Sequence, residues 1–380
     1  MINDKIFNRN YDNKLSGLLK PGKALLIYGP RRVGKTFLVK RFLSTYEGRY
    51  YSGVGEDMTL RGLIGSQDVQ RIISSFKGYS LVFIDEAQKI PDIALGLKIM
   101  VDHLPDLVII ASGSSSFQLS SQLGEPLTGR YFPLFLFPLA IKELYEQFGG
   151  MYIHEHLEEF LIFGTYPEVM LMDNRLDKQE YLLNLRDSYL FKDILELENI
   201  RNADKLTDLL KLLAFQIGHE VSLNELGNTL GLAKQTVERY LDLLEKAFVI
   251  KKVRGFSRNL RSEISKSSRY YFLDNGIRNA LINNFNYISS RNDIGMLWEN
   301  FLFLERIKKC HYSRIFTNVY FWRTYNREEI DLVEEREGQL WGYEFKWGSK
   351  RPKPPESWLE TYKDAHFECI SRENFLDFIV

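Results

Sequence analysis

One run of eight residues near the start of the chain has the residue types and spacing that bind phosphate. It matches the pattern G-x-x-x-x-G-K-[ST] and consists of Gly29, Pro30, Arg31, Arg32, Val33, Gly34, Lys35 and Thr36. The run follows the apolar segment Ala24–Tyr28 and precedes a helical pattern from Phe37, which is the context that the motif requires. We expect backbone N–H groups to face phosphates, Lys35 to reach the β- and γ-phosphates, and Thr36 to ligate Mg²⁺. The residues from Gly29 to Phe37 are therefore predicted to bind a nucleotide.

A second apolar segment, residues 81–84, ends in two carboxylates, Asp85 and Glu86. In doubly wound folds, ligands bind at the carboxyl ends of the strands, so this pair is expected near the phosphate loop. We predict that Asp85 holds Mg²⁺, directly or through water, and that Glu86 orients and deprotonates the attacking water. The acidic pair thus favours a hydrolase over a passive nucleotide binder.

Three further candidates lie next to the following apolar segments. Ser112 and Ser114 follow Leu107–Ile110 and either contact the γ-phosphate or its water, or cap a strand end. Arg130 precedes the segment Tyr131–Phe137 and either stabilises transition-state charge in a neighbouring subunit or lies on the surface. The residues alone leave both alternatives open.

Near the C-terminus, three carboxylates and a lysine have the pattern of a metal-dependent phosphodiesterase. Glu299 lies in a helical run, Asp331 in the strand-like run Glu329–Val333, and Glu344 and Lys346 in or just after Leu340–Phe345. Residues two apart on a strand project to the same face, so Glu344 and Lys346 are expected to point together. The arrangement resembles the PD-(D/E)xK restriction-endonuclease-like fold, and this resemblance implies Glu299, Asp331 and Glu344 as metal ligands and Asp331, Glu344 and Lys346 as catalytic residues. The alternative is a solvated strand face without activity.

The elements that must position these residues can be read from the apolar pattern. From residue 21 to about 140, short continuous apolar runs alternate with helical segments, which predicts an α/β fold with a parallel sheet and helices on both faces. From 141 to 213 the pattern is helical and indicates a lid. From 214 to 285 a capping box at Ser222 and Glu225, a turn at Gly231 and a helix at Lys234–Lys246 are typical of a winged helix.

A basic stretch follows the predicted helix-turn-helix. Residues 251–270 contain seven Lys or Arg and one Glu: Lys251, Lys252, Arg254, Arg258, Arg261, Lys266, Arg269 and Glu263. Such a stretch resembles a DNA-binding wing. The alternative is packing against an acidic partner, because residues 151–200 hold eleven Asp or Glu and only four Lys or Arg. The sequence therefore predicts DNA as a partner and leaves a protein partner open.

Composition limits the class of protein. The 380 residues carry 50 Lys or Arg and 50 Asp or Glu, which argues against a chain that coats nucleic acid along its whole length. With only two cysteines, Cys310 and Cys369, there is no disulfide framework. No run approaches the roughly 20 apolar residues of a membrane span. We expect a cytoplasmic protein with no membrane partner.

The motifs together resemble a known family. The runs GPRRVGKT, FIDEAQ, SGSSS and the Gly-Arg pair before a strand look like AAA+ ATPases of the AAA_14, or archaeal-ATPase-like, family. FGTYPEVML, SYLFKDILELENIRN and YFLDNGIRNAL also resemble that family, in which a C-terminal DUF4143 region usually follows. The last 95 residues are similar to the PD-(D/E)xK restriction-endonuclease-like fold. The resemblance implies an AAA+ core that binds ATP rather than GTP, with Mg²⁺.

The combined prediction is a four-domain chain. Residues 1–140 are expected to form the P-loop AAA+ core, 141–213 a helical lid, 214–285 the winged helix and 286–380 a nuclease-like α/β domain. The predicted function is a Mg²⁺-dependent, ATP-hydrolysing switch or motor that associates with DNA. The alternatives are an ATP-gated protein-interaction regulator with a catalytically dead nuclease-like platform, and a chaperone-like ring in which Arg130 acts between subunits.

Overall fold

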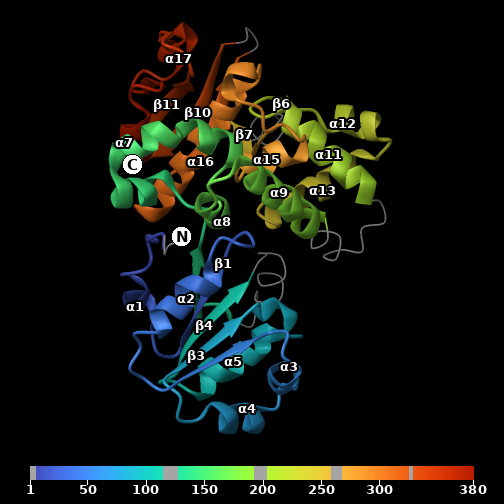
Figure 1. Cartoon of the computed structure of the whole chain (residues 1–380), viewed down its shortest axis with the longest axis vertical. Helices are drawn as coiled ribbons and strands as arrows, with labels where there is room; N and C mark the ends of the chain where they lie inside the picture. The colour runs from blue at the N-terminus through green and yellow to red at the C-terminus, as the bar shows by residue number, and fades with distance from the viewer. Residues whose placement is uncertain (1–5, 114–126, 192–202, 258–267, 325–327) are drawn as a thin grey trace. The chain divides into compact units, whose positions relative to one another are not determined.

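A computed structural model describes residues 6–113, 127–191, 203–257, 268–324 and 328–380 (Figure 1). The chain forms two compact units, which are described separately below. The nucleotide unit contains residues 8–138 and 246–248, and the C-terminal unit contains residues 139–245 and 249–380 together with the first seven residues. The predicted Ser114 and the basic-stretch residues Arg258, Arg261 and Lys266 lie outside the described residues.

The nucleotide unit is built on a parallel sheet. Its described strands have the order β2-β3-β4-β1-β5. They are β1 (Lys23–Tyr28), β2 (Tyr50–Val54), β3 (Leu81–Asp85), β4 (Val108–Gly113) and β5 (Tyr131–Phe135). Every pair is parallel, with Leu25 of β1 opposite Ile110 of β4 and Phe132 of β5. The predicted α/β fold with a parallel sheet is confirmed, and β1, which precedes the phosphate motif, lies between β4 and β5.

Two helices of the nucleotide unit begin at a capping aspartate. The described helices of this unit are α1 (Leu15–Leu18), α2 (Lys35–Leu43), α3 (Met58–Gly65), α4 (Val69–Phe76), η1 (Ala87–Lys89) and α5 (Ile93–His103). The Asp57 carboxylate accepts hydrogen bonds from the first backbone N–H groups of α3, and Asp68 does so for α4. Strand β3 is buried along its whole length, and its side chains share a core with those of α4 and α5. That packing fixes the strand end at which Asp85 lies.

The C-terminal unit begins with helices. They are α7 (Ile141–Phe163), α8 (Pro167–Leu171), α9 (Arg175–Leu185), η2 (Arg186–Phe191), α11 (Ala203–Phe215), α12 (Leu223–Leu230), α13 (Lys234–Lys246), α15 (Asn275–Leu281), η3 (Ile288–Ser290), α16 (Ile294–Tyr312), α17 (Glu356–Thr361) and α18 (Phe375–Ile379). Helix α7 is kinked at Gly149, where φ is 81° and breaks the helical path. Ser222 caps α12 and Gly231 ends it in the left-handed conformation. None of the described helices is long and apolar enough to cross a membrane.

One sheet runs through the C-terminal unit. Its described strands have the order β12-β11-β10-β9-β7-β8-β6. They are β6 (Glu220–Val221), β7 (Ile250–Gly255), β8 (Ser268–Phe272), β9 (Asn318–Arg323), β10 (Glu329–Arg336), β11 (Gln339–Phe345) and β12 (His366–Ile370). Strands β7 and β9 are parallel neighbours, with Arg254 opposite Tyr320. The boundary predicted after residue 285 therefore falls within one continuous sheet, and the four-domain division stays a prediction.

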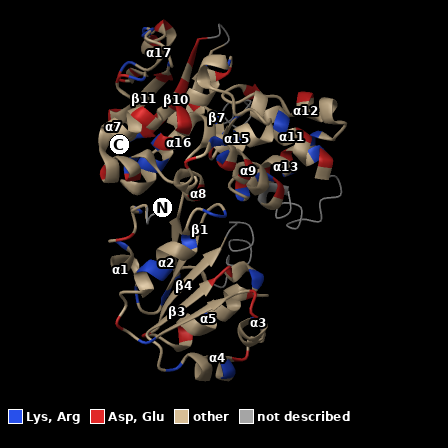
Figure 2. Ribbon diagram, in the orientation of Figure 1, with Lys and Arg blue, Asp and Glu red and all other residues tan. Residues whose placement is uncertain are grey.

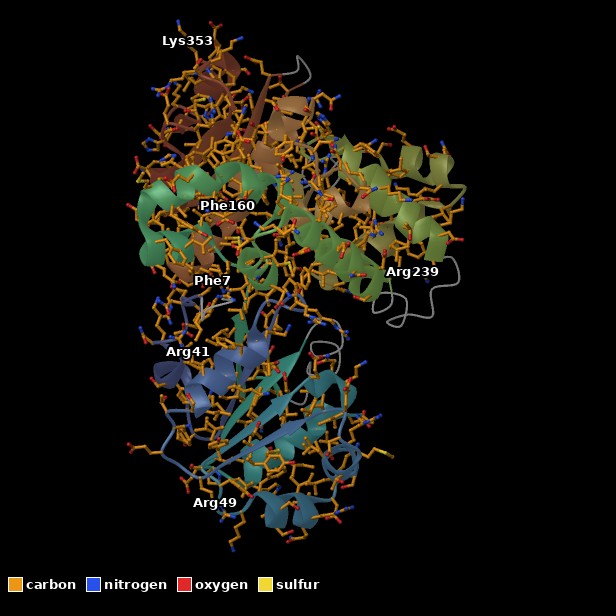
Figure 3. The ribbon with its side chains drawn as sticks, in the orientation of Figure 1. Phe7, Arg41, Arg49, Phe160, Arg239 and Lys353 are labelled. Carbon is orange, nitrogen blue, oxygen red and sulfur yellow. The ribbon has the colours of Figure 1, made fainter. Side chains whose placement is uncertain are left out.

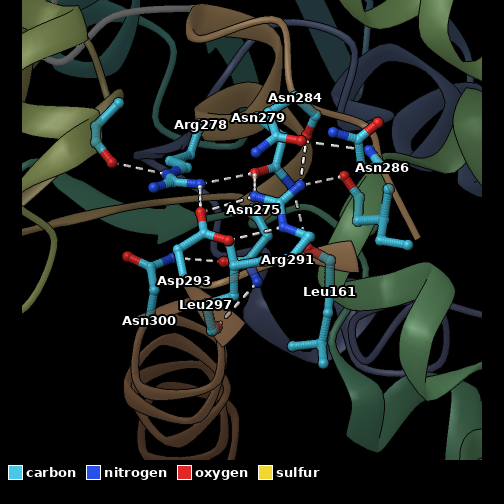
Figure 4. Close-up of polar contacts among 12 residues, drawn as sticks. Leu161, Asn275, Arg278, Asn279, Asn284, Asn286, Arg291, Asp293, Leu297 and Asn300 are labelled. Carbon is cyan, nitrogen blue, oxygen red and sulfur yellow. Dashed lines mark hydrogen bonds and ion pairs between the residues drawn. The ribbon is translucent and has the colours of Figure 1, made fainter. Parts of the chain in front are cut away.

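A buried polar network fixes α15 in this unit (Figure 4). Asp293 accepts hydrogen bonds at 2.6 Å from Arg278 and 2.8 Å from Arg291. Asn279 donates to the main-chain oxygens of Leu161 and Ile162 at the end of α7. Buried charges are tolerated when they are paired and hydrogen-bonded, as they are here. The network joins α15 to α7 and to the start of α16, the helix that carries Glu299.

Candidate functional site

The phosphate motif forms the loop between β1 and α2. Gly29 has φ of 149°, and a Cβ at this position would collide with the carbonyl oxygen of Leu136. Gly34, with φ of 95°, sits in the left-handed region directly before the first residue of α2. Both glycines are therefore required by the backbone itself. Of the other predicted residues, Val33 is buried, Arg32 is exposed and Phe37 is half-exposed.

Lys35 is buried inside this loop. Its Nζ donates hydrogen bonds to the carbonyl oxygens of Gly29, at 2.9 Å, and Pro30, at 2.8 Å. Burial lowers the pKa of the Lys35 ammonium to about 8, although the carboxylates of Glu86 and Asp85 oppose that shift. Because the hydrogen-bond partners of this ammonium are neutral carbonyl oxygens, a phosphate could replace them and supply a negatively charged partner.

Asp85 joins three elements at the carboxyl edge of the sheet. Thr36 Oγ1, at the start of α2, donates to Asp85 Oδ2 at 2.7 Å, and Ser112 Oγ, near the end of β4, donates to Asp85 Oδ1. Asp85 is only 8% exposed, so these hydroxyls fix the orientation of its carboxylate. A hydroxyl beside a carboxylate next to a phosphate loop is a donor set that suits Mg²⁺.

Glu86 lies one residue beyond β3. Its φ is 48°, an unusual backbone conformation for a residue other than glycine. The side chain accepts a hydrogen bond from Gln88 Nε2, so the carboxylate is oriented by its own loop. The structure thus brings Lys35, Thr36, Asp85, Glu86 and Ser112 to one edge of the sheet.

Arg9 is a residue of this region that sequence reasoning missed. Its guanidinium donates to the carbonyl oxygen of Val33 at 2.5 Å and to that of Phe137 at 2.7 Å. Arg9 is 8% exposed and ties the phosphate loop to the segment after β5. A lone arginine 20 residues before the motif carries no spacing signal, so only the fold reveals this contact.

Arg130 pairs within its own unit. Its Nε lies 2.6 Å from Asp102 Oδ1, and its side chain is 39% exposed. This is an ordinary surface ion pair, of the kind that contributes at most about 1 kcal/mol. Arg130 remains accessible, and its predicted action on a neighbouring subunit stays a prediction.

The C-terminal unit gathers the other predicted residues around an arginine. Nη1 of Arg269, on β8, lies 3.6 Å from Glu299 Oε1 on α16 and 3.7 Å from Asp331 Oδ1 on β10. Arg269 Nη2 lies 3.0 Å from Glu329 Oε2. Next to them Lys346 pairs with Glu344 at 2.6 Å. We call Glu299, Glu329, Asp331 and Glu344 the carboxylate cluster.

Burial and mutual repulsion raise the pKa values of carboxyl groups in this cluster. Burial, and then the Asp331 charge, raise the pKa of Glu299 to about 8, while Arg269 and the Tyr271 hydroxyl oppose the shift. Burial and Asp331 likewise raise the pKa of Glu344 to about 7, against the pull of Lys346. Burial also raises the pKa of Asp331, although the Phe345 N–H donates to it at 2.9 Å.

The metal site predicted at Glu299, Asp331 and Glu344 stays a prediction. Among the described residues, no group of three or more His, Cys, Asp or Glu side chains could hold one ion. The Arg269 guanidinium lies within ion-pair distance of both Glu299 and Asp331. The sequence placed Arg269 in the basic stretch and gave no sign that its side chain turns inward.

The helix-turn-helix of α12 and α13 presents mixed charge. On α13 the exposed side chains include Lys234, Glu238, Arg239 and Asp242, so neither sign dominates (Figures 2 and 3). In the basic stretch, Lys251 lies 3.4 Å from Glu245. Because Arg269 is buried in the carboxylate cluster, the positive charge available to a phosphate backbone is smaller than the sequence suggests.

Comparison with protein families divides the chain into three matched regions. The AAA domain family AAA_14 matches residues 21–145. Two domains of unknown function, DUF8612 and DUF4143, match residues 154–287 and 294–373. The predicted combination of an AAA_14 domain with a C-terminal DUF4143 region is confirmed.

Three similar proteins carry the description uncharacterized protein. One from Methanocaldococcus jannaschii is 26% identical over 79% of this chain and 69% of its own length. A protein from Haemophilus influenzae is 25% identical over 80% of this chain and 79% of its own length. A protein from Mycobacterium tuberculosis is 28% identical over 90% of this chain and 74% of its own length. A solved Signal Transduction ATPase with Numerous Domains from Pyrococcus horikoshii is 15% identical, with a TM-score of 0.31, over 80% of this chain and 45% of that chain. This chain thus spans less than half of that protein.

Proposed function

We propose that this chain, which joins an AAA domain to a DUF4143 domain, is a switch driven by Mg²⁺-dependent ATP hydrolysis. One observation carries the proposal. A buried lysine in a glycine-bounded loop lies beside a carboxylate whose two oxygens are held by Thr36 and Ser112. The AAA domain match supports an ATPase-type function, and the arrangement supplies the groups that phosphoryl transfer requires.

The roles of the residues follow from their geometry. Lys35 exchanges the carbonyl oxygens of its loop for phosphate oxygens, and the N–H groups at the start of α2 face the same anion. Thr36 and Asp85 are the residues that would hold Mg²⁺, which supplies Lewis-acid stabilisation of developing charge when it is bound. Glu86 accepts the proton of the attacking water, and Gln88 fixes the direction of its carboxylate.

Glu86→Gln tests this assignment. The variant keeps the shape of the side chain but loses its basicity, so we expect ATP binding near the wild-type level and a loss of turnover of about 100-fold or more. Lys35→Ala should lose binding as well as turnover. Glu47→Gln, an exposed change in the same unit, is the matched control. Turnover at the wild-type rate in Glu86→Gln would reject the site.

We also propose that the C-terminal unit associates with DNA through α12, α13 and the basic stretch. The support is the helix-turn-helix order of capped helix, glycine turn and second helix. Duplex DNA should stimulate ATP hydrolysis, and the stimulation should fade as salt is raised. A rate that is indifferent to DNA would favour the second candidate, an ATP-gated regulator that binds protein. The mixed charge of α13 supports that second candidate, because a DNA-binding helix usually presents mainly basic side chains.

The variant Arg130→Ala tests whether this arginine acts on a neighbouring subunit. If Arg130 completes a neighbour's site, Arg130→Ala should lower turnover in concentrated protein and leave ATP binding unchanged. Asp102→Asn removes the partner of the same ion pair and is the control for a merely local effect. Equal rates in wild type and Arg130→Ala would refute the subunit role and the ring hypothesis with it.

A further inference from the structure

We infer that Arg269 occupies the place of the metal ion in the carboxylate cluster, so that the DUF4143 domain is a metal-free unit closed to divalent cations. The guanidinium is the cation of the cluster, and it belongs to β8, the strand in which the basic stretch ends. This inference is independent of the ATP site proposed above.

Arg269 already occupies the space beside these carboxylates. The oxygens of Glu299, Asp331 and Glu329 lie 3.0–3.7 Å from the nitrogens of Arg269, which are ion-pair distances. A divalent ion entering between Glu299 and Asp331 would have to displace the guanidinium, because both charges would otherwise occupy one site.

Packing holds Arg269 in position. The residue is 2% exposed, and its guanidinium carbon lies 4.5 Å from the centre of the Phe321 ring. On the far side, the Tyr271 hydroxyl donates to Glu299 Oε1 at 2.8 Å. A Cβ on Gly218 would lie only 2.5 Å from the same carboxylate oxygen, so the chain covers Glu299 closely. Protein groups therefore contact both Glu299 and Arg269 closely.

The cluster already contains cations from the protein itself. Among the described residues, Arg269 lies within ion-pair distance of Glu299, Glu329 and Asp331, and Lys346 pairs with Glu344.

Two consequences follow for the function of the unit. Without a bound metal ion, the cluster lacks the group that would activate water against a phosphodiester, so the DUF4143 domain does not cleave nucleic acid by that route. Arg269 is also unavailable to a phosphate backbone, and removing it should leave the salt dependence of any DNA binding unchanged. Its role is to join β8 to α16 and β10 by ion pairs.

Binding of Mn²⁺ tests the inference directly. The full chain, without nucleotide, is titrated with Mn²⁺ and the free ion is measured by electron paramagnetic resonance. We expect no difference between wild type and Asp331→Asn, because neither has a Mn²⁺ site at the carboxylate cluster. Mn²⁺ binding by wild type that Asp331→Asn abolishes would overturn the inference. This comparison needs no change at Arg269.

The variant Arg269→Met is measured in a second Mn²⁺ titration. This substitution keeps an aliphatic side chain over Phe321 and removes the positive charge. Affinity for Mn²⁺ should rise by about tenfold or more, because a like charge within about 4 Å of the ion has gone. Adding Asp331→Asn to this variant should remove the gained site. Circular dichroism establishes that the variant is folded. A folded Arg269→Met that gains no Mn²⁺ binding would refute Arg269 as the occupant.

Discussion

The two hydroxyls on Asp85 allow a quantitative test of the nucleotide site. Thr36→Val keeps the side-chain shape and removes the donor to Asp85 Oδ2, and Ser112→Ala removes the donor to Oδ1. A hydrogen bond to a charged group contributes about 1.5–3 kcal/mol. Each single variant should therefore lower the free energy of unfolding of the nucleotide unit by about 2 kcal/mol.

The double variant shows whether the two hydroxyls act on one carboxylate. Independent effects would add to about 4 kcal/mol, whereas residues in one hydrogen-bond network couple by about 0.5–3 kcal/mol. Once the first donor is lost, Asp85 can turn or bind a proton, so the second loss costs less. We expect the double variant to lose about 3 kcal/mol. Strict additivity would refute the shared network.

The distribution of tryptophan makes the assay specific. All five tryptophans, residues 298, 322, 341, 347 and 358, belong to the C-terminal unit. Urea unfolding followed by amide hydrogen exchange in β1 and β3 reports on the nucleotide unit, and tryptophan fluorescence serves as the internal control. Thr36→Ser keeps the hydroxyl and should retain both stability and Mg²⁺-dependent turnover. A change in the tryptophan transition would show that the variants act elsewhere.

Three further outcomes are expected in the nucleotide unit. The pKa of Lys35 is about 8, and a bound phosphate favours the protonated form. ATP affinity, measured by calorimetric titration, should therefore fall about tenfold between pH 7 and pH 9. The Lys35→Arg variant should show no such fall. Arg9→Ala removes two hydrogen bonds to Val33 and Phe137 and should cost roughly 2–4 kcal/mol by urea unfolding, where a loss under 0.5 kcal/mol would contradict the contacts. Gly29→Ala should abolish ATP binding in a filter assay, since its Cβ collides with backbone, and retained binding would refute that geometry.

The sequence by itself determined the parts of this protein whose information lies within one short segment. The phosphate loop, the strand ending at Asp85 and the capped helix at Ser222 each depend on neighbours a few residues apart, so their spacing was readable. The parallel sheet followed for the same reason, because buried runs between helices have few other solutions.

Only the tertiary structure decided which distant side chains meet. The contact of Arg9 with Phe137 joins residues 128 apart in the sequence. Arg269 on β8 contacts Glu299 on a helix, α16, and Asp331 on another strand, β10. A basic residue in a basic stretch has the same sequence signature whether its side chain faces solvent or turns inward. Strand register and packing set that direction, and in this protein they turn Arg269 of the basic stretch toward the buried carboxylates of Glu299 and Asp331.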